Sequence, residues 1–375
     1  MIQIDFFSND IIKALVPVRT SKPEEVYFLI KKGKEKSREA IRLRQAILRW
    51  GFTKKVEFVP VDTHSVHDIN EKIRFLLSST SDEVFIDLSG GGELMIACGR
   101  SACFGKRATA IYADFEKDCL IEAESGKAIA PLCHIGIDDY VTAINAKRMG
   151  NSRMLPSPSQ YGDVVSMARL MFDDVVAWKA LNTYITNEFP YQLCDSFTVS
   201  GKLYRECKKL LDGFCRFGFL LKNENRYYFT DKKAKSYVYN YGLWLELFVY
   251  IKAKEIYSEV GCGFLIDWTG DDGVNTQDNE IDVIILHRSV PLFISCKMTR
   301  PEAADVYEVG FLARRFGGAS ARYAIATTFP VRRFGNGEKG IFKRFTKMNC
   351  GLIETDDLGD GKNSAVFKKA FSSNQ

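Results

Sequence analysis

Histidine is scarce in this sequence and closely paired cysteines are absent, which argues against a metal site built from histidine and cysteine. Only 4 of the 375 residues are histidine, and His64 and His67 have no cysteine or further histidine beside them. The 10 cysteines are scattered with no CxxC pair, a pattern that favours reduced core thiols over a zinc site or a disulfide framework. Any divalent metal ion is therefore expected on carboxylates.

Long apolar runs are also lacking, and no secretory leader is expected. No uninterrupted apolar stretch approaches the roughly 18–20 residues needed to cross a bilayer. The N-terminal stretch MIQIDFFSNDIIKAL carries acidic and amide side chains where a signal peptide places Lys or Arg before its apolar segment. We therefore expect no membrane span and a cytoplasmic protein.

The composition is that of an ordinary globular chain, with 46% hydrophobic and 26% charged residues. At roughly 100–200 residues per domain, the length predicts two or three domains. The net charge is +5, and residues 297–347 hold 11 Lys and Arg against 4 Asp and Glu. This basic stretch suits a polyanionic partner such as nucleic acid.

The order of β-like and helix-like stretches predicts an α/β protein with three parts. Residues 1–150 alternate short β-rich runs with amphipathic stretches, the pattern of a parallel sheet wrapped by helices. A segment rich in Gly, Ser and Pro at 147–164 indicates a connection. Residues 165–240 read as helices followed by two β-like runs, a winged-helix-like connector. Residues 241–375 begin with helix, three strands, helix and strand, the core order of the restriction-endonuclease-like fold.

A glycine-rich turn stands out in the first part. The sequence DLSGGGELM at 87–95 follows a strand-like run and precedes a helix, so glycine backbone and helix N–H groups can approach a phosphate. It is not GxGxxG, which disfavours NAD. Ligands of parallel sheets bind beyond the carboxyl ends of strands. The residues expected at one pocket are Ser8, Asn9, Asp10, Ser89, Gly90, Gly91, Gly92, Glu93 and Met95. A tight turn that binds nothing is the alternative.

A second motif spans residues 279–297, NEIDVIILHRSVPLFISCK. If its two strands are adjacent, Asp282 and Lys297 share one end of a sheet. Such a pair suits phosphodiester hydrolysis, because a carboxylate holds a divalent cation while an ammonium offsets developing charge. Glu280 lies two residues before Asp282 on the same strand face and could also bind the metal. Asp282 is favoured because it lies nearer the apolar run.

Two further acids are candidates. Glu246 interrupts an otherwise apolar helix-like stretch, LWLELF, where an unpaired carboxylate is costly to bury, so a metal or lysine partner is indicated. A solvent-facing helix position is the alternative for Glu246. The second candidate acid is Glu308, in the helix-like stretch that follows Lys297.

Both motifs resemble known families. The strand, glycine turn and Leu-Met helix at 87–95 resemble the CRISPR-associated Rossmann-fold (CARF) sensor domain, with Gly92-Glu93 where that family usually has Thr-Lys. The resemblance implies a homodimer that binds a cyclic oligoadenylate across its two-fold axis. Residues 279–297 resemble the PD-(D/E)xK nuclease motif, with Ser295 where an acid or Gln is usual.

Together the motifs resemble the two-domain ancillary nucleases of type III CRISPR systems. This implies an endonuclease activated by cyclic tetraadenylate, which uses Mg²⁺ or Mn²⁺ to cut DNA, with single-stranded RNA as a further candidate substrate. The implied catalytic set is Asp282, Lys297, Glu246, Ser295, Glu280 and Glu308, and the implied metal ligands are Asp282, Glu246 and Cys296. Which of the three glutamates replaces the acid missing at Ser295 stays open. The alternative is a ligand-responsive transcription regulator whose winged-helix-like segment binds duplex and whose nuclease-like domain is inactive.

Overall fold

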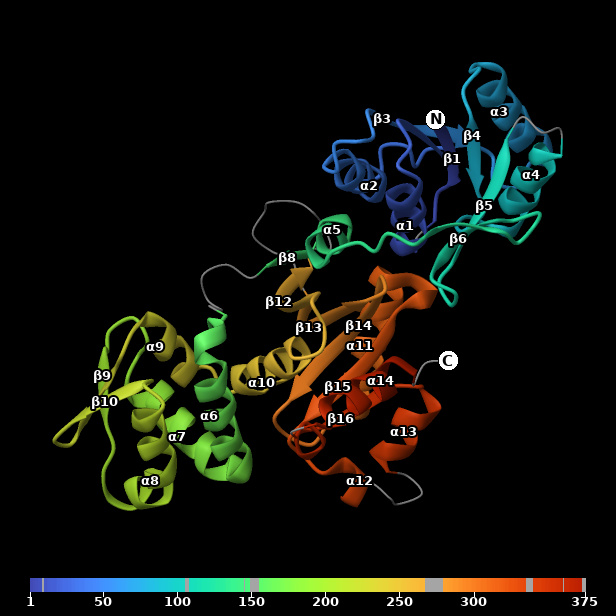
Figure 1. The fold of residues 1–375 in the computed structure, drawn as a ribbon. Coiled ribbons are helices and arrows are strands. Elements are labelled where there is room, and N and C mark those ends of the chain that lie inside the picture. Colours follow the sequence, from blue (N-terminus) through green and yellow to red (C-terminus); the bar gives the residue numbers. More distant parts are fainter. Residues whose placement is uncertain are drawn as a thin grey trace.

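The computed structural model of the protein describes residues 1–8, 10–104, 108–144, 146–148, 155–266, 279–334, 340–359 and 361–372. Three sheets organise these residues, one in each successive part of the chain (Figure 1). Within the described residues, no helix combines the length and the apolar character that a bilayer-crossing segment needs.

The N-terminal part is built on a seven-stranded sheet in the order β3-β2-β1-β4-β5-β6-β7. Neighbours from β3 to β5 run parallel and the last two strands are antiparallel, which confirms the predicted α/β parallel sheet. Because chain progression reverses between β1 and β4, a crevice is expected at their carboxyl ends. The elements are β1 (Ile2–Phe6), α1 (Ile11–Ser21), β2 (Glu25–Lys31), α2 (Arg38–Leu48), β3 (Lys55–Val61), α3 (Val66–Ser78), β4 (Val84–Asp87), α4 (Glu93–Cys103), β5 (Thr109–Asp114), β6 (Cys119–Glu122), β7 (Ala128–Pro131) and α5 (Ile137–Ala143).

The middle part combines helices with a small antiparallel sheet in the order β10-β11-β9. Its core is aromatic, with Trp178, Phe197 and Phe214 fully buried. The helices and the two β-like runs expected between residues 165 and 240 are present, while the winged-helix assignment stays a prediction. The elements are η1 (Pro158–Gln160), α6 (Tyr161–Asp173), α7 (Val175–Glu188), β9 (Ser196–Thr198), α8 (Gly201–Arg216), β10 (Leu220–Asn223), β11 (Arg226–Phe229) and α9 (Lys232–Tyr239).

The C-terminal part holds a six-stranded sheet in the order β16-β15-β14-β13-β12-β8. Helix, three strands, helix and strand follow one another as expected. β8 (Ala146–Arg148) pairs with β12, so residues assigned by sequence to the first part complete the last sheet. The other elements are α10 (Leu243–Lys254), β12 (Val260–Ile266), β13 (Asn279–His287), β14 (Val290–Lys297), α11 (Ala303–Gly317), η2 (Gly318–Ser320), β15 (Arg322–Thr327), α12 (Val331–Phe334), α13 (Ile341–Lys347), β16 (Gly351–Glu354), η3 (Thr355–Asp357) and α14 (Asn363–Ser372).

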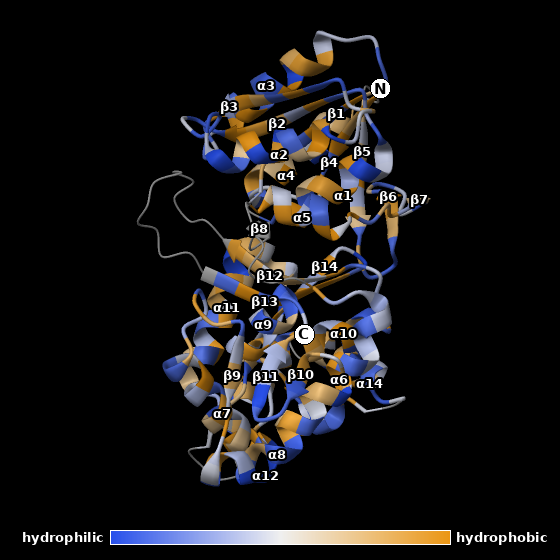
Figure 2. Cartoon of the chain, turned by 90° about the vertical axis from the view of Figure 1, so that its left-hand side faces the viewer, coloured by the Kyte–Doolittle hydropathy of each residue, from blue (hydrophilic) through white to orange (hydrophobic). Residues whose placement is uncertain are grey.

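The three parts share hydrophobic cores across the C-terminal sheet. On one face, Val283 and Ile294 pack in a cluster that includes Trp178 of the middle part. On the other face, Phe293 packs in a cluster that includes Tyr140 of α5. Hydrophobic segments run through both large sheets in Figure 2. The N-terminal part therefore packs on one face of the C-terminal sheet, and the middle part packs on α10, which covers the other face.

Candidate active site and ligand hollow

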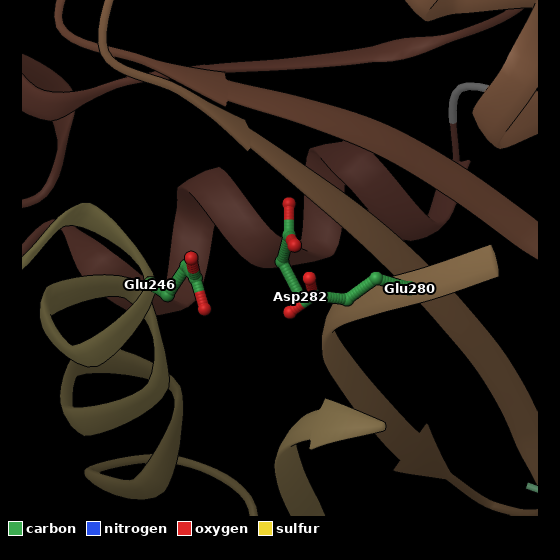
Figure 3. A group of neighbouring side chains, drawn as sticks. All are labelled: Glu246, Glu280 and Asp282. Carbon is green, nitrogen blue, oxygen red and sulfur yellow. The ribbon is translucent and has the colours of Figure 1, made fainter. Parts of the chain in front are cut away.

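Three carboxylates meet where α10 approaches the beginning of β13 (Figure 3). Glu246 comes from the first turn of α10, and Glu280 and Asp282 come from β13. One oxygen of each carboxylate lies within 4.8 Å of the others. Glu246 is only 6% exposed, although α10 is otherwise almost wholly apolar. An all-oxygen cluster of this kind suits a hard cation such as Mg²⁺ or Mn²⁺.

An irregular stretch of β13 brings Asp282 into this acid trio (Glu246, Glu280 and Asp282). Ile281 packs in the same cluster as Ile284, whereas Val283 packs on the other face of the sheet. The two-residue alternation of a strand is therefore broken at Asp282. Opposite Asp282 on β12 lies Gly263, whose φ is +67°, a conformation that glycine adopts without strain. Glu280 and Asp282 nevertheless come together in the trio, as their spacing of two residues predicted.

The backbone of β14 holds the carboxylate of Asp282. The Cys296 N–H donates a hydrogen bond of 2.7 Å to Oδ2 of Asp282. Burial, with the nearby charges of Asp282 and Glu246, raises the pKa of the Cys296 thiol well above its ordinary value. The structure brings Cys296 to the trio as a backbone donor, and its predicted role as a metal ligand stays a prediction.

On the α11 side, the end of β14 closes an adjoining hollow of about 200 Å³, here called the active-site hollow. Its polar lining consists of Glu280, Asp282, Ser295, Lys297 and Glu308. Nζ of Lys297 lies 2.9 Å from Oδ1 of Asp305. Burial works against the ammonium charge, but the hydrogen bond and charge of Asp305, with the carboxylates of Asp282 and Glu308, raise the pKa of Lys297. Lys297 is therefore a stable cation beside the carboxylates.

All six catalytic candidates of the sequence lie in this region. Five line the active-site hollow, and Glu246 joins Glu280 and Asp282 from α10. Sequence reasoning missed Asp305, the partner of Lys297. Its only sequence signal is an acid in the first turn of α11, where a helix-capping role is the ordinary explanation.

A larger hollow opens beside the glycine-rich turn and is here called the ligand hollow, with a volume of about 770 Å³. The predicted residues that line it are Ser8, Gly91, Gly92, Glu93 and Met95. Gly91 has a φ of +88°, and an added Cβ would lie 2.3 Å from Cβ of Phe6, so only glycine fits there. The ligand hollow also contains Lys31 and Lys34, which sequence reasoning missed, and Arg315, which was expected only as part of the basic stretch at 297–347. Because Glu39 and Glu93 line the hollow as well, these three cations leave it a small excess of positive charge, which favours a polyanion.

Three predicted ligand residues do not line this hollow, and Asn9 lies outside the described residues. The buried Ser89 hydroxyl donates a hydrogen bond of 2.5 Å to Asp87 and accepts one of 2.8 Å from the Ala113 N–H. Ser89 therefore stabilises the glycine-rich turn. Gly90 packs beneath the turn, where an added Cβ would lie 3.0 Å from the Phe6 carbonyl oxygen. Asp10 is buried against the C-terminal part and accepts a hydrogen bond of 3.3 Å from the Ser320 hydroxyl.

A buried carboxyl pair lies under the turn. Asp5 and Asp87 directly follow the paired residues Ile4 and Ile86 on adjacent strands, and they are 1% and 2% exposed. Burial raises the pKa of Asp87 to about 7, although hydrogen bonds from Ser89 work in the opposite direction. Burial and the charge of Asp87 raise the pKa of Asp5 well above its ordinary value.

Known structures share this arrangement of the whole chain. Protein VC1899 from Vibrio cholerae matches with a TM-score of 0.79 and 19% sequence identity, over 100% of this chain and 98% of that one. Can2 from Sulfobacillus thermosulfidooxidans, solved in complex with cyclic tetra-adenylate, matches with a TM-score of 0.67 and 16% identity, over 100% of this chain and 99% of that one. The chain shares the fold of both. No protein-family model matches the sequence, and a search of curated proteins gave no match either.

Proposed function

We propose that the protein is a metal-dependent endonuclease of type III CRISPR defence that a cyclic oligoadenylate activates. In this proposal, residues 1–150 are a CARF-like sensor, residues 165–240 a winged-helix-like connector and residues 241–375 a restriction-endonuclease-like domain. The observation that carries the proposal is the acid trio with Lys297 beside it. The likeness in fold to Can2, which was solved with cyclic tetra-adenylate, supports the identity of the activator.

The acid trio fits a divalent cation of the Mg²⁺ or Mn²⁺ type. Glu246, Glu280 and Asp282 would hold the ion, and a bound ion would polarise a phosphoryl oxygen and lower the pKa of a bound water. Asp282 is oriented for this by the amide of Cys296. Lys297, kept protonated by Asp305, is positioned to neutralise charge that develops on the phosphate of DNA or single-stranded RNA.

The ligand hollow suits a cyclic nucleotide with several phosphates. Gly91 and Gly92 expose backbone at the start of α4, where N–H groups and the helix dipole favour an anion. The cations of the hollow add long-range attraction. A homodimer through α3 and α4 is part of the proposal, because these neighbouring helices expose the apolar side chains Phe75 and Leu94, and Phe104 directly after α4 is exposed as well.

A plasmid assay tests the nuclease. Supercoiled DNA is incubated with the protein, Mn²⁺ and cyclic tetraadenylate, and Asp282→Asn is compared with Asp163→Asn, which changes an exposed acid on α6. We expect Asp282→Asn to lose more than about 100-fold in rate, since loss of a second-shell group alone costs roughly 10–100-fold. Equal cleavage by both variants would reject the proposal.

One observation favours a second candidate, the ligand-responsive transcription regulator with an inactive nuclease-like domain. Ser295 supplies no charge at a position where the nuclease motif usually has an acid. In addition, α8 exposes a row of basic residues, namely Lys202, Arg205, Lys208 and Lys209. Duplex binding that changes with cyclic tetraadenylate, with no metal-dependent cutting of any nucleic acid, would support this candidate instead.

A further inference from the structure

We propose that α11 couples the ligand hollow to the active-site hollow, and that Arg315 in its last turn binds a phosphate of the ligand. The inference rests on the proposed function, because it takes a phosphate-bearing activator as the occupant of the ligand hollow. It adds a binding residue from the C-terminal part to a hollow otherwise built by the N-terminal part.

The two ends of α11 reach the two hollows. In its first turn, Asp305 pairs with Lys297 at 2.9 Å, and Glu308 lines the active-site hollow. Ten residues after Asp305, Arg315 lines the ligand hollow together with Ser8. At a rise of 1.5 Å per residue, the backbones of Asp305 and Arg315 lie about 15 Å apart along one helix. A single rigid element therefore contacts both places.

Arg315 is held by a weak interaction that a phosphate can replace. Its Nη2 lies 3.6 Å from Oε1 of Glu39, and the two side chains are 44% and 50% exposed. Exposed ion pairs of this length contribute little to stability. A guanidinium forms stronger, bidentate hydrogen bonds with a phosphate. Ligand entry is therefore expected to exchange Glu39 for a phosphate at Arg315.

The C-terminal end of α11 is docked on Tyr140 of α5 and on Asp10, the residue before α1. The Tyr140 hydroxyl donates to the Phe316 carbonyl at 3.3 Å. Gly318, which ends the helix, is so close to Asp10 that an added Cβ would lie 2.6 Å from its Cγ. Asp10 directly precedes α1 and lies two residues after Ser8 of the hollow. A shift of Asp10 on ligand binding is therefore expected to move the end of α11.

The consequence is a link between ligand occupancy and Lys297. A movement of α11 changes the distance between Asp305 and Lys297, and with it the availability of the ammonium for a substrate phosphate. Because coupling between two binding sites is reciprocal, substrate binding is expected to strengthen ligand binding in turn.

Ligand affinity tests the role of Arg315. Arg315→Ala is compared with Arg314→Ala, which removes the same charge one residue earlier on a side chain that lines a different hollow, beside Tyr323. Binding of cyclic tetraadenylate to the full chain is measured by calorimetry, and thermal melting checks folding. We expect Arg315→Ala to weaken binding by about tenfold or more, as for loss of a charged hydrogen bond, and Arg314→Ala to change it less than about threefold. Equal affinities for the two variants would overturn the binding role.

Cleavage at saturating ligand tests the coupling. For Asp305→Asn, we expect the ratio of ligand-stimulated to ligand-free cleavage to fall, because Lys297 no longer depends on α11 for its partner. An unchanged ratio would overturn the coupling through this pair. If the unaltered protein itself neither binds cyclic tetraadenylate nor cuts nucleic acid, the proposed function fails. Binding and cleavage by the unaltered protein with no distinction between Arg315→Ala and Arg314→Ala reject only the inference.

Discussion

Replacing Asp87 by Asn is expected to stabilise the N-terminal part above neutral pH. Asp87 and Asp5 lie side by side beneath the glycine-rich turn, almost without solvent exposure. Burial raises the pKa of Asp87 from 3.8 to about 7. Asn keeps an amide oxygen that can accept the hydrogen bonds that Ser89 now donates to Asp87, and it removes the buried charge.

The sign and size of the effect follow from proton linkage. Between about pH 4 and pH 7, the folded state keeps a proton that the unfolded chain has released, so stability falls as pH rises through this window and stays lowest above it. A difference of about 3 pKa units at 1.36 kcal/mol each gives about 4 kcal/mol, an upper order of magnitude. Below about pH 4, the group contributes almost nothing.

Urea unfolding at pH 5 and pH 8 measures the effect. The unaltered protein should lose more stability than Asp87→Asn between these pH values, by as much as about 2.7 kcal/mol, because only about 2 of the 3 pKa units lie above pH 5. Asp114→Asn, at the end of the neighbouring strand β5, is the control. Hydrogen bonds from the backbone N–H groups of Lys117 and Glu116 lower the pKa of Asp114, so this change should bring no gain at pH 8. Matching pH profiles for Asp87→Asn and the unaltered protein would refute the reasoning.

Two further predictions concern cutting and assembly. Lys297→Met should reduce plasmid cleavage by more than about 100-fold, because the charge that stabilises the transition state is lost. The affinity for Mn²⁺, measured by calorimetry, should change less than about threefold. Loss of both cleavage and Mn²⁺ binding would contradict separate roles for Lys297 and the acid trio. Phe75→Glu, at a side chain that is 67% exposed on α3, should shift a dimer toward monomer in analytical ultracentrifugation, whereas Val176→Glu, at an 80% exposed position on α7, should not. An unchanged dimer in both variants would remove α3 from the interface.

Most strands of the two large sheets could be predicted from local sequence patterns. Alternating β-rich runs and amphipathic stretches predicted the parallel N-terminal sheet, because its helices bury one face and the central strand β1 is buried along its whole length. β8 was not predicted, because its three residues lie beside a Gly-, Ser- and Pro-rich stretch and pair with a strand more than 100 residues later. The local sequence pattern of β8 contains no information about its pairing with β12.

The acids of the active site were predictable because each departs from its surroundings. Glu246 in an apolar helix signalled a buried carboxylate that needs a partner. Asp305 and Arg315 carried no such signal, because charged residues in the first and last turns of a helix are ordinary. Their importance arises from contacts with Lys297 and Glu39, which tertiary packing alone creates. Asp10 was expected at the ligand, but its contact with Ser320 belongs to packing between the parts of the chain.

Anomalous scattering from a crystal soaked in Mn²⁺ tests the acid trio most directly. We expect one strong peak within coordination distance of oxygens from Glu246, Glu280 and Asp282, and no such peak in crystals of Asp282→Asn soaked in the same way. A peak elsewhere in the chain, or none between these three carboxylates at saturating Mn²⁺, would contradict the assignment of the catalytic metal site.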